Sequence, residues 1–579
     1  MGEMSLEITE ELTVDILILG GGGAALMCAL HATDQVPTPR VLMVVKGLLG
    51  KSGCTRMVQG GMNAVLNPKD SLEAHFRDTV VGGAFLNDQE LVWLLVTRAP
   101  RVVFELENRY GVLFDRDEYG RIHQKPFAGQ SFNRTVHKGD LTGIEVMERL
   151  REAVWARSSL AFLEDAQAVA LLPGKKGGIG GALVLDHRSG RFLVVRAKAT
   201  VLATGGGPTF YRFSTPSREK SLDGTALAYR AGAELMDLEM IQFHPTGLVC
   251  PDSELNGAVL EEGLRGAGAV LLNARGERFM VRYDPTRMER STRDIVARAA
   301  YLEIMEGRGT PQGGVYIDIS HLGREKVEAM FPGMVERTRM AGYDLATGPV
   351  EVCPTAHFIM GGVRIDEMCR TSLPGLYAAG EDAAGVHGAN RLGGNGIAES
   401  LVFGALAGEV LREEVTEKAL PEVDIFYARE AVRELMNGLS AEQGESPTDL
   451  WVELKDLMWS HVGVVREEAL LREAVRRLEE LRERAKQLRV GPTNQFNLTL
   501  MQALSLRNAM EVAWLVAQSA LHRNESRGAH FRRDQPRSWD APKNLVLRRS
   551  PDGKPSFEWR SPRMTRLQPE ELGKWNERS

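Results

Sequence analysis

The chain has 579 residues, of which 43% are hydrophobic, 26% are charged and 6% are aromatic. This length predicts about three to five structural units with a large buried core, and the composition is typical of a globular protein. Lys plus Arg total 71 against 77 Asp plus Glu, so the net charge is −6. The sequence therefore offers no overall basic field to hold nucleic acid, and we expect no nucleic-acid partner.

The five cysteines are scattered along the chain and form no CxxC pair. The sequence therefore predicts no zinc site, no iron-sulfur cluster of its own and no other metal site, and it fits a reducing compartment. Residues 1–15 are acidic, and the apolar run Ile16 to Leu19 is far shorter than the roughly 18 apolar residues of a membrane span. We therefore expect a mature cytoplasmic chain.

A dinucleotide-binding unit is predicted near the start of the chain. The strand-like run Val14 to Leu19 is followed by glycines 20–23, the helix-like run Ala24 to Ala32 and a second strand from Arg40 to Val45. Strand, glycine-rich turn and helix in this order are typical of proteins that hold a dinucleotide at the end of a parallel sheet.

Within that turn, Gly20, Gly22 and Ala25 form the G-x-G-x-x-A pattern. The first two glycines allow a tight turn and close approach of a pyrophosphate to the helix N-terminus, and the third small residue lets helix and strand pack closely. The second strand ends in Val45 and Lys46 instead of the acid that binds an NAD ribose, so a simple NAD prediction fails here.

Residues 160–207 contain strand-like runs at Ala168 to Leu172, Ile179 to Leu185 and Arg191 to Val195, and end in VLATGGG at 201–207. We expect an inserted β-rich layer that returns to the main sheet. Residues 247–350 mix helical stretches with a strand-like run from Gly314 to Ile319.

From about residue 424 the pattern is helical. Between Glu467 and Leu488 an apolar stripe recurs at spacings of three and four, formed by Leu471, Ala474, Leu478, Leu481, Ala485 and Leu488. The stripe lasts only about three heptads, which favours a packed surface helix over a zipper with a partner. The tail after Arg532 is rich in Pro, Arg, Asp and Ser, and we expect it to drape over the surface.

Several separated segments occur in the order found in one protein family. They are SGCTRMVQGG at 52–61, VLATGGG at 201–207, QFHPTG at 242–247, EEGLRGAG at 261–268, TRDIVAR at 292–298, PTAHFIMGGV at 354–363, GLYAAGED at 375–382, HGANRLGGNG at 387–396 and ESRGAHFRRD at 525–534. From about residue 14 to residue 540 the chain resembles the flavoprotein subunits of succinate dehydrogenase and fumarate reductase, with L-aspartate oxidase as the nearest relative.

The resemblance implies an α/β fold in which a Rossmann-like FAD-binding domain carries an inserted α+β capping domain and is followed by a helical domain and a short C-terminal segment. The expected limits are 1–246 and 351–415 for the FAD-binding domain, 247–350 for the capping domain, 416–532 for the helical domain and 533–579 for the C-terminal segment. Such a capping domain can close over substrate and exclude water.

FAD is the cofactor that the resemblance implies. Glu381 would bind its ribityl or ribose hydroxyls, and segments around residues 59–61 and 204–206 would line its isoalloxazine and adenine sides. The full set of expected cofactor residues is Gly20, Gly22, Gly23, Ala25, Lys46, Ser52, Cys54, Thr55, Gln59, Gly60, Gly61, Thr204, Gly205, Asp223, Glu381, Arg391, Gly394 and Ile397. In this family the second-strand acid is commonly absent, which removes the objection raised by Lys46.

The resemblance also assigns the catalytic groups. His244, His357 and Arg391 match the family's dicarboxylate-binding groups, and Arg293 matches the arginine that donates a proton to the substrate carbon while flavin N5 delivers hydride. Guanidinium suits a dianionic four-carbon acid because it offers two parallel charge-assisted hydrogen bonds to a carboxylate. An arginine with a pKa above about 12 must be resupplied with protons, and Glu262 and Arg265 occupy the positions of that relay.

Three departures from the family stand out. Respiratory members attach FAD through a histidine, whereas Cys54 aligns with that position, so we predict that FAD is bound non-covalently. The alternative is a thioether between FAD and Cys54, and the non-functional interpretation is that Cys54 only packs against its neighbours. Glu261 replaces a threonine that donates to a substrate carboxylate, and an acid there costs affinity for a dianion unless it is protonated or turned away. Gly396 replaces a serine near the flavin, which removes one hydrogen bond.

The resemblance therefore implies a catalytic flavoprotein subunit that interconverts fumarate and succinate, with fumarate reduction favoured by non-covalent flavin. An iron-sulfur protein subunit would exchange its electrons, and a membrane anchor or further redox subunit on other chains could hold it at the inner face of the cell membrane. L-aspartate oxidase and reduction of a modified four-carbon dicarboxylate remain as alternatives, and a flavin-bearing redox or binding module without turnover is a third.

Overall fold

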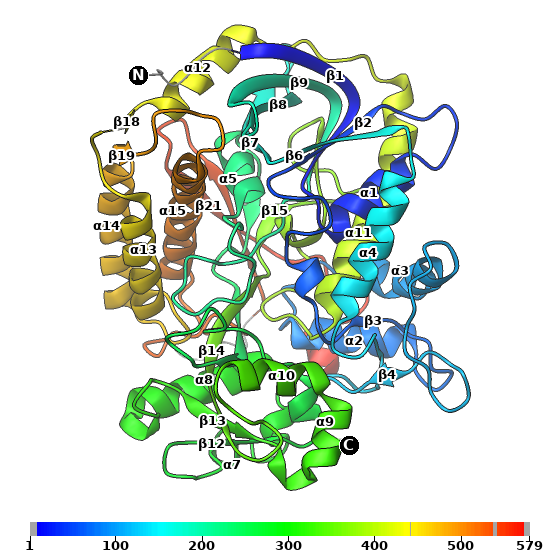
Figure 1. The fold of residues 1–579 in the computed structure, drawn as a ribbon, viewed down its shortest axis with the longest axis vertical. Helices are drawn as coiled ribbons and strands as arrows, with labels where there is room; N and C mark the ends of the chain where they lie inside the picture. The colour runs from blue at the N-terminus through cyan, green and yellow to red at the C-terminus, as the bar shows by residue number, and fades with distance from the viewer. Residues whose placement is uncertain (1–7, 441, 536–540, 573–579) are drawn as a thin grey trace.

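The computed structural model describes residues 8–440, 442–535 and 541–572 (Figure 1). Part of the acidic N-terminal stretch, residues 1–7, lies outside the described residues, as do residues 536–540 and 573–579 of the C-terminal tail. The protein has an upper α/β body, a lower lobe built from residues around 241–359, and a layer of helices along one side (Figure 1). The predicted α/β class is confirmed by this architecture.

The main sheet has seven strands in the order β6-β2-β1-β9-β8-β7, with β16 paired to the end of β9. The strands β6, β2, β1, β9 and β16 pair in parallel, and β7 and β8 form the expected antiparallel layer beside β9. Their bounds are β1 Ile8–Leu19, β2 Val41–Val45, β6 Leu160–Glu164, β7 Ala166–Pro173, β8 Ile179–Asp186, β9 Arg191–Leu202 and β16 Leu376–Ala378.

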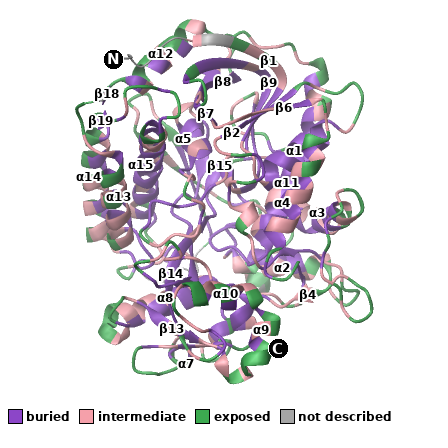
Figure 2. Ribbon diagram, viewed as in Figure 1, coloured by how far each residue is buried: buried purple, intermediate pink, exposed green. Residues whose placement is uncertain are grey.

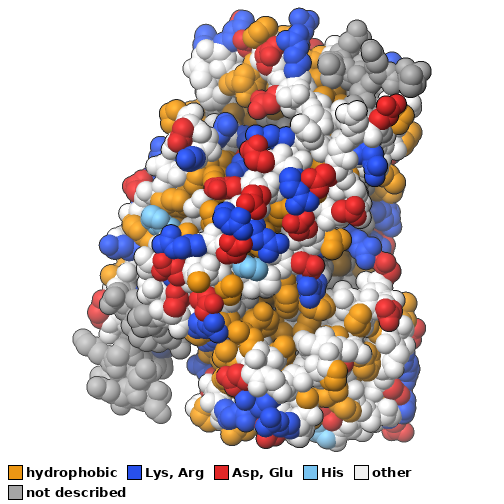
Figure 3. Space-filling model, turned by 90° about the vertical axis from the view of Figure 1, so that its left-hand side faces the viewer, with side chains coloured by type: hydrophobic (Ala, Val, Ile, Leu, Met, Phe, Trp, Pro, Cys, Tyr) orange, Lys and Arg blue, Asp and Glu red, His pale blue; other side chains and the backbone are white. Residues whose placement is uncertain are grey.

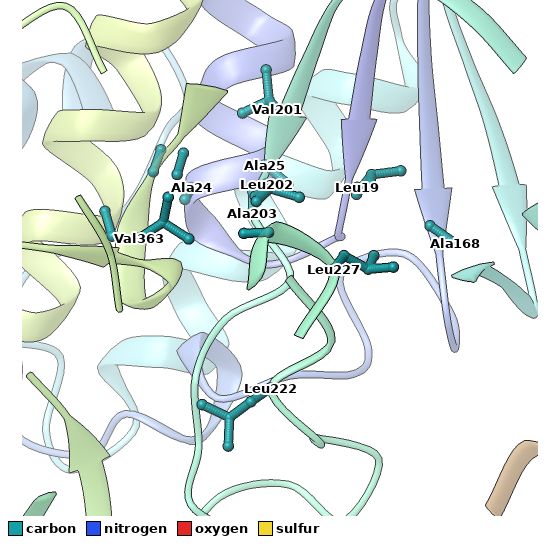
Figure 4. Close-up of a cluster of buried hydrophobic side chains, with 14 of the residues drawn as sticks. Leu19, Ala24, Ala25, Ala168, Val201, Leu202, Ala203, Leu222, Leu227 and Val363 are labelled. Carbon is teal, nitrogen blue, oxygen red and sulfur yellow. The ribbon is translucent and has the colours of Figure 1, made fainter. Parts of the chain in front are cut away.

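The predicted first helix is α1 (Gly23–Ala32), and all of its residues are buried. It packs on α11 (Asn395–Glu417), where a Cβ on Gly404 would lie 2.4 Å from the Ala24 carbonyl oxygen, so only glycine permits this approach. Apolar side chains of β1, α1 and β9, including Leu19, Ala25 and Leu202, form one cluster around the start of the helix (Figure 4). This cluster fixes the position of the glycine turn between β1 and α1.

Further helices and short strands complete the body. They are α2 Leu72–Gly82, α3 Gln89–Asn108, α4 Thr142–Trp155, α5 Asp223–Arg230, β3 Met62–Asn63, β4 Gln124–Lys125 and β5 Thr135–Val136.

The lower lobe has its own hydrophobic core, formed by residues from Leu248 to Val352. Its sheet has the order β11-β14-β13-β12, with β11 Ile241–Leu248, β14 Val350–Ile359, β13 Val315–Asp318 and β12 Val270–Leu272. Its helices are α6 Gly263–Gly266, α7 Met280–Tyr283, α8 Arg293–Glu303, α9 Arg324–Met330 and α10 Pro332–Met340. The chain enters and leaves this lobe through the paired strands β11 and β14, which therefore bring distant residues together at its base.

The helical layer consists of α12 Ile425–Met436, α13 Pro447–His461, α14 Glu468–Arg484 and α15 Leu498–His522, with the short strands β18 Leu439–Ser440 and β19 Leu488–Arg489. The predicted stripe on α14 is buried and faces α13 and α15, whereas the outer faces of α13 and α14 are exposed (Figure 2). Basic and acidic side chains alternate on this side of the molecule, with hydrophobic side chains nearer the lower lobe (Figure 3). The packed-helix interpretation is confirmed.

The prediction for the C-terminal tail is wrong in one part. Residues 544–549 form β20, whose Leu545, Val546 and Leu547 are buried, and β21 (Pro555–Arg560) pairs with it. The strands join a five-stranded sheet in the order β17-β15-β10-β20-β21, with β10 Leu235–Met236, β15 Gly362–Arg364 and β17 Ala383–Ala384. The segment Asn-Leu-Val-Leu-Arg-Arg lacks the alternation of apolar and polar residues typical of a half-buried strand, and pairing with β10 buries its three apolar side chains. None of the helices in the described ranges has the length and apolar character to span a bilayer.

Candidate active site

A cavity of about 1290 Å³ lies where the main sheet, the lower lobe and the helical layer meet. Most of the residues that the sequence predicts for the site line it. They are Gly22, Gly23, Lys46, Cys54, Thr55, Gln59, Gly60, Gly61, Gly205, His244, Glu261, Glu262, Arg293, His357, Glu381, Arg391, Gly394 and Ile397. Segments that are hundreds of residues apart in sequence are thus brought to one space.

The remaining predicted residues lie outside its wall. Gly20, Ser52, Thr204 and Asp223 line a smaller space of about 50 Å³ next to it, beside Lys46. Two more line neither space: Ala25, which is fully buried in α1, and Arg265, which lies behind Glu262.

The glycine turn forms one end of the cavity. Gly20 has a φ of +132°, and a Cβ there would lie 2.0 Å from the Ala203 carbonyl oxygen, so the position requires glycine. Gly22 precedes α1 and provides no side chain at the helix N-terminus, where the Gly23 N–H is bonded to the Thr55 hydroxyl at 3.1 Å. An open helix N-terminus against a cavity fits a dinucleotide pyrophosphate, because free N–H groups and the helix dipole attract anions.

Two adjacent acids, Glu381 and Asp382, follow β16, and Glu381 lines the same wall. Glu381 Oε1 accepts hydrogen bonds of 3.1 Å from the backbone N–H groups of Ile359 and Gly207, and burial raises its pKa to about 7. Asp382 accepts from the backbone and hydroxyl of Thr204, so this threonine positions Asp382 and does not face the larger cavity. Glu381 is a half-buried acceptor on the wall and fits a cofactor hydroxyl.

Lys46 and Asp223 are bonded to each other. The Lys46 Nζ lies 2.9 Å from Asp223 Oδ2 and 2.9 Å from the Ser221 hydroxyl, and Asn508 of α15 donates to Asp223 Oδ1 at 2.6 Å. Burial raises the Asp223 pKa, but Lys46 and the hydrogen bonds outweigh burial, so the net shift is downward. This pair ties the second strand to α5 and the helical layer at the edge of the cavity.

Cys54 lines the cavity as a half-buried free thiol. Burial, with a smaller contribution from the Glu381 charge, raises its pKa to about 12. The thiol is therefore protonated at neutral pH, and the reactive thiolate is disfavoured.

A chain of charges crosses from the cavity into the lower lobe. Arg293, the first residue of α8, donates from Nε (2.9 Å) and Nη2 (2.6 Å) to Glu262 Oε2, and its Nη1 donates to Gln242 Oε1 at 3.1 Å. Arg265 Nη2 donates to the other oxygen of Glu262 at 3.0 Å. Burial opposes ionisation of Glu262, but the charges of Arg293 and Arg265 outweigh it and lower the pKa of Glu262. Both oxygens of one buried carboxylate are thus held by two arginines.

Two imidazoles lie side by side at the base of the lobe. His244 on β11 and His357 on β14 have ring centroids 5.3 Å apart. The Thr246 N–H lies 3.4 Å from His244 Nδ1, and the Thr215 hydroxyl lies 2.7 Å from His357 Nδ1. Burial, followed by the charge of Arg293, lowers the pKa of both rings well below the usual value, so both are neutral at pH 7.

Arg391 is a further cationic group of the wall and is 6% exposed. Its guanidinium lies over the ring of Phe358 at 4.3 Å, and its Nε has no hydrogen-bond partner among the described residues. Burial, with repulsion from Arg293, lowers the Arg391 pKa to about 9. A buried guanidinium with an unsatisfied hydrogen-bond donor is stabilised by a nearby anion, which is consistent with an anionic ligand in this cavity.

Several neighbours of these groups were missed by the sequence prediction. Gln242 accepts from Arg293 and donates to the Asn390 side chain at 3.0 Å and to the Arg391 carbonyl at 2.7 Å, so it joins Arg293 to the segment that carries Arg391. Its place in the QFHPTG segment could have drawn attention to it. Phe358 lies in the PTAHFIMGGV segment and offered a similar signal, whereas Thr215 lies outside all of the family-like segments, and only the fold brings it to His357.

Comparison with known proteins places the chain in a family. Residues 15–397 match the FAD binding domain family, and residues 451–573 match the family described as Fumarate reductase flavoprotein C-term. An uncharacterized FAD-dependent oxidoreductase of Methanocaldococcus jannaschii is 45% identical over 91% of this chain and 94% of its own length. One of the subunits of the fumarate reductase (CoM/CoB) of Methanothermobacter marburgensis is 43% identical over 92% of this chain and 96% of its own.

The fold is shared with solved structures as well. The FrdA protein of Escherichia coli quinol fumarate reductase superposes with a TM-score of 0.92 at 32% identity, over 97% of this chain and 98% of that one. An L-aspartate oxidase of Ralstonia nicotianae is a further relative, 36% identical over 91% of this chain and 96% of its own. The chain therefore belongs to the family of fumarate reductase and succinate dehydrogenase flavoprotein subunits, and it is an FAD-dependent oxidoreductase.

Proposed function

We propose that the chain is a catalytic flavoprotein subunit that interconverts fumarate and succinate, with reduction of fumarate favoured. The observation that carries the proposal is the buried Arg293, Glu262 and Arg265 chain, which ends on the wall of a cavity that also holds His244, His357 and Arg391. A cation that is both hydrogen-bonded to a carboxylate and open to the cavity is suited to donate a proton to a bound anion and to be resupplied.

The cationic wall would bind the two carboxylates of the substrate. Arg391 lines the cavity and would offer charge-assisted hydrogen bonds, and His244, whose Nδ1 accepts from the Thr246 backbone N–H, carries its proton on Nε2, where it can donate to a carboxylate. Because these groups are buried, the carboxylates would exchange water for fixed donors, which raises the strength of each contact.

Proton transfer would run through the arginine chain. Arg293 would donate from a terminal nitrogen to the substrate carbon, and Glu262, held between Arg293 and Arg265, would return a proton to it. Bound FAD supplies the hydride for the adjacent carbon. Closure of the lower lobe would exclude water from this site, and His244 and His357 lie on the two strands that connect that lobe to the body.

The electrons would come from an iron-sulfur partner. Two of the relatives of matching length are named as subunits, and the match to the fumarate reductase flavoprotein C-term family, residues 451–573, includes most of α13 and all of α14 and α15. Attachment to the inner face of a membrane would then depend on other chains. We also propose that the limits of the capping domain, 247–350, follow its separate hydrophobic core.

Flavin attachment gives a first prediction. Acid precipitation of the holoenzyme should leave the flavin in the supernatant, because Cys54 replaces histidine and its thiol is protonated. The absorbance of both fractions at flavin wavelengths measures this. Yellow protein in the pellet would contradict non-covalent binding, and loss of that colour in Cys54→Ala would identify a thioether.

The proposed activity is tested by anaerobic assays with reduced viologen as electron donor. We expect fumarate-dependent oxidation of the viologen and formation of succinate. L-aspartate-dependent peroxide formation without fumarate reduction would instead support an L-aspartate oxidase, which the 36% identical relative keeps as the second candidate. Preference for a substituted four-carbon dicarboxylate would support the alternative of a modified substrate, which Glu261 motivates.

A further inference from the structure

Glu261 lies on the cavity wall next to the arginine chain, but it takes no part in it. The side chain is 2% exposed, and neither of its carboxyl oxygens has a hydrogen-bond partner among the described residues. The neighbouring Glu262 has both oxygens bound by arginines. Two adjacent buried acids that line one cavity therefore have opposite environments: Glu262 is held by two arginines, whereas the Glu261 carboxyl has only the Lys125 ammonium at ion-pair distance among the described residues.

The groups around Glu261 come from three other parts of the fold. Lys125 of β4 has its Nζ 3.5 Å from Glu261 Oε1, but this ammonium already donates to the Gly139 carbonyl at 2.7 Å. Arg337 of α10 donates to the Val259 carbonyl at 2.8 Å and lies beside Gln59, and Asp140, just before α4, adds a negative charge. The cations are thus partly occupied elsewhere, and Asp140 opposes their effect.

We propose that Glu261 binds the substrate as the neutral acid and donates its O–H to a substrate carboxylate, so that one proton enters the site with each dianion. This inference rests on the proposed function, since it assumes a dicarboxylate in the cavity. A neutral carboxyl group supplies the hydroxyl donor that the family obtains from threonine, whereas an ionised one would repel the ligand. The step moves one proton from solvent to Glu261 and leaves it there while the ligand is bound.

The electrostatics agree with this geometry. Burial, reinforced by Asp140, raises the pKa of Glu261 to about 7, although Lys125 and Arg337 act in the opposite direction. In the absence of ligand the group is protonated below about pH 7 and ionised above it. Because only the protonated form accepts the dianion, affinity should be highest on the acidic side and should fall about tenfold for each pH unit above about 7.

Calorimetric titration of the FAD-loaded enzyme with malonate, a dicarboxylate that cannot be reduced, tests the proposal. Titrations between about pH 7 and about pH 8.5, in HEPES and in Tris, give both the affinity and the number of protons taken up. At the alkaline end we expect wild type to take up close to one proton more per ligand than E261Q, and the affinity of E261Q to fall less steeply with pH than that of wild type. Glu381 also titrates near this range, but it is present in both proteins and cannot produce the difference.

Glu254→Gln serves as the matched control. Glu254 also borders the cavity, but its side chain is 83% exposed and pairs with Arg218, so E254Q removes the same charge without touching the Glu261 cluster. E254Q should take up protons as wild type does. Equal proton uptake by wild type and E261Q, with fumarate reduction intact, would overturn this inference alone. Failure of wild type to bind any dicarboxylate or to reduce fumarate would overturn the proposed function, and the inference with it.

Discussion

Arg293→Gln should lower the rate of fumarate reduction by about 10² to 10⁴-fold, the usual contribution of a positioned acid, while FAD stays bound. Glutamine cannot carry the proton, and it breaks both hydrogen bonds that Arg293 makes to Glu262. Steady-state viologen assays give the rate, and the flavin-to-protein absorbance ratio gives the cofactor content. Loss in kcat with a smaller change in KM would separate proton donation from substrate binding.

The control for this variant is Arg290→Gln. Arg290 lies three residues before Arg293 but is exposed and does not line the cavity, so R290Q should reduce fumarate at the wild-type rate. Wild-type turnover by R293Q would show that another group donates the proton. Loss of flavin in R293Q would show that the arginine has a structural role in the cofactor site instead.

Gly20→Ala should abolish FAD binding, with at least about a tenfold fall in flavin per protein after purification. The new Cβ would lie 2.0 Å from the Ala203 carbonyl oxygen, and the φ of +132° is one that an L side chain rarely adopts. The backbone must shift to relieve this contact, and a shift would move the turn before α1 that would hold the pyrophosphate.

Gly111→Ala separates the effect of the steric contact from the effect of the unfavourable backbone φ. Gly111 has a φ of +74°, but a Cβ there meets no atom within 4 Å among the described residues, so G111A adds backbone strain without a clash. We expect G111A to lose about 1 to 2 kcal/mol of unfolding free energy and to keep its flavin. Equal flavin content in G20A and wild type would contradict the role of the turn.

Local patterns predict much of the fold. We predicted the strand, glycine turn and helix from β1 to α1, and also the apolar stripe of α14, because residues close together in the sequence form each of these patterns. The strand β20 was missed, since its burial depends on β10, more than 300 residues earlier in the chain. A short window of sequence does not reveal pairing between strands that are so far apart along the chain.

In the candidate site, too, some residues could be predicted from the sequence and others depend on contacts between distant segments. The resemblance selected Arg293, His244, His357 and Arg391, and most of the selected residues line one cavity. Gln242 and the Lys125 contact to Glu261 were not predicted, because each depends on how side chains from separate segments face one another. Asp223 was selected as a cofactor residue, but the structure shows it bonded to Lys46 and Asn508 at the edge of the site.

The most direct test of the account is a single-turnover experiment on the purified, FAD-loaded chain. The flavin is reduced anaerobically and mixed with fumarate, and its absorbance is followed while succinate is quantified. We expect fumarate to reoxidise the flavin and one succinate to form for each flavin, with no partner protein present. A flavin that stays reduced in excess fumarate, yet is reoxidised at once by oxygen, would contradict the central claim that this cationic cavity reduces a four-carbon dicarboxylate.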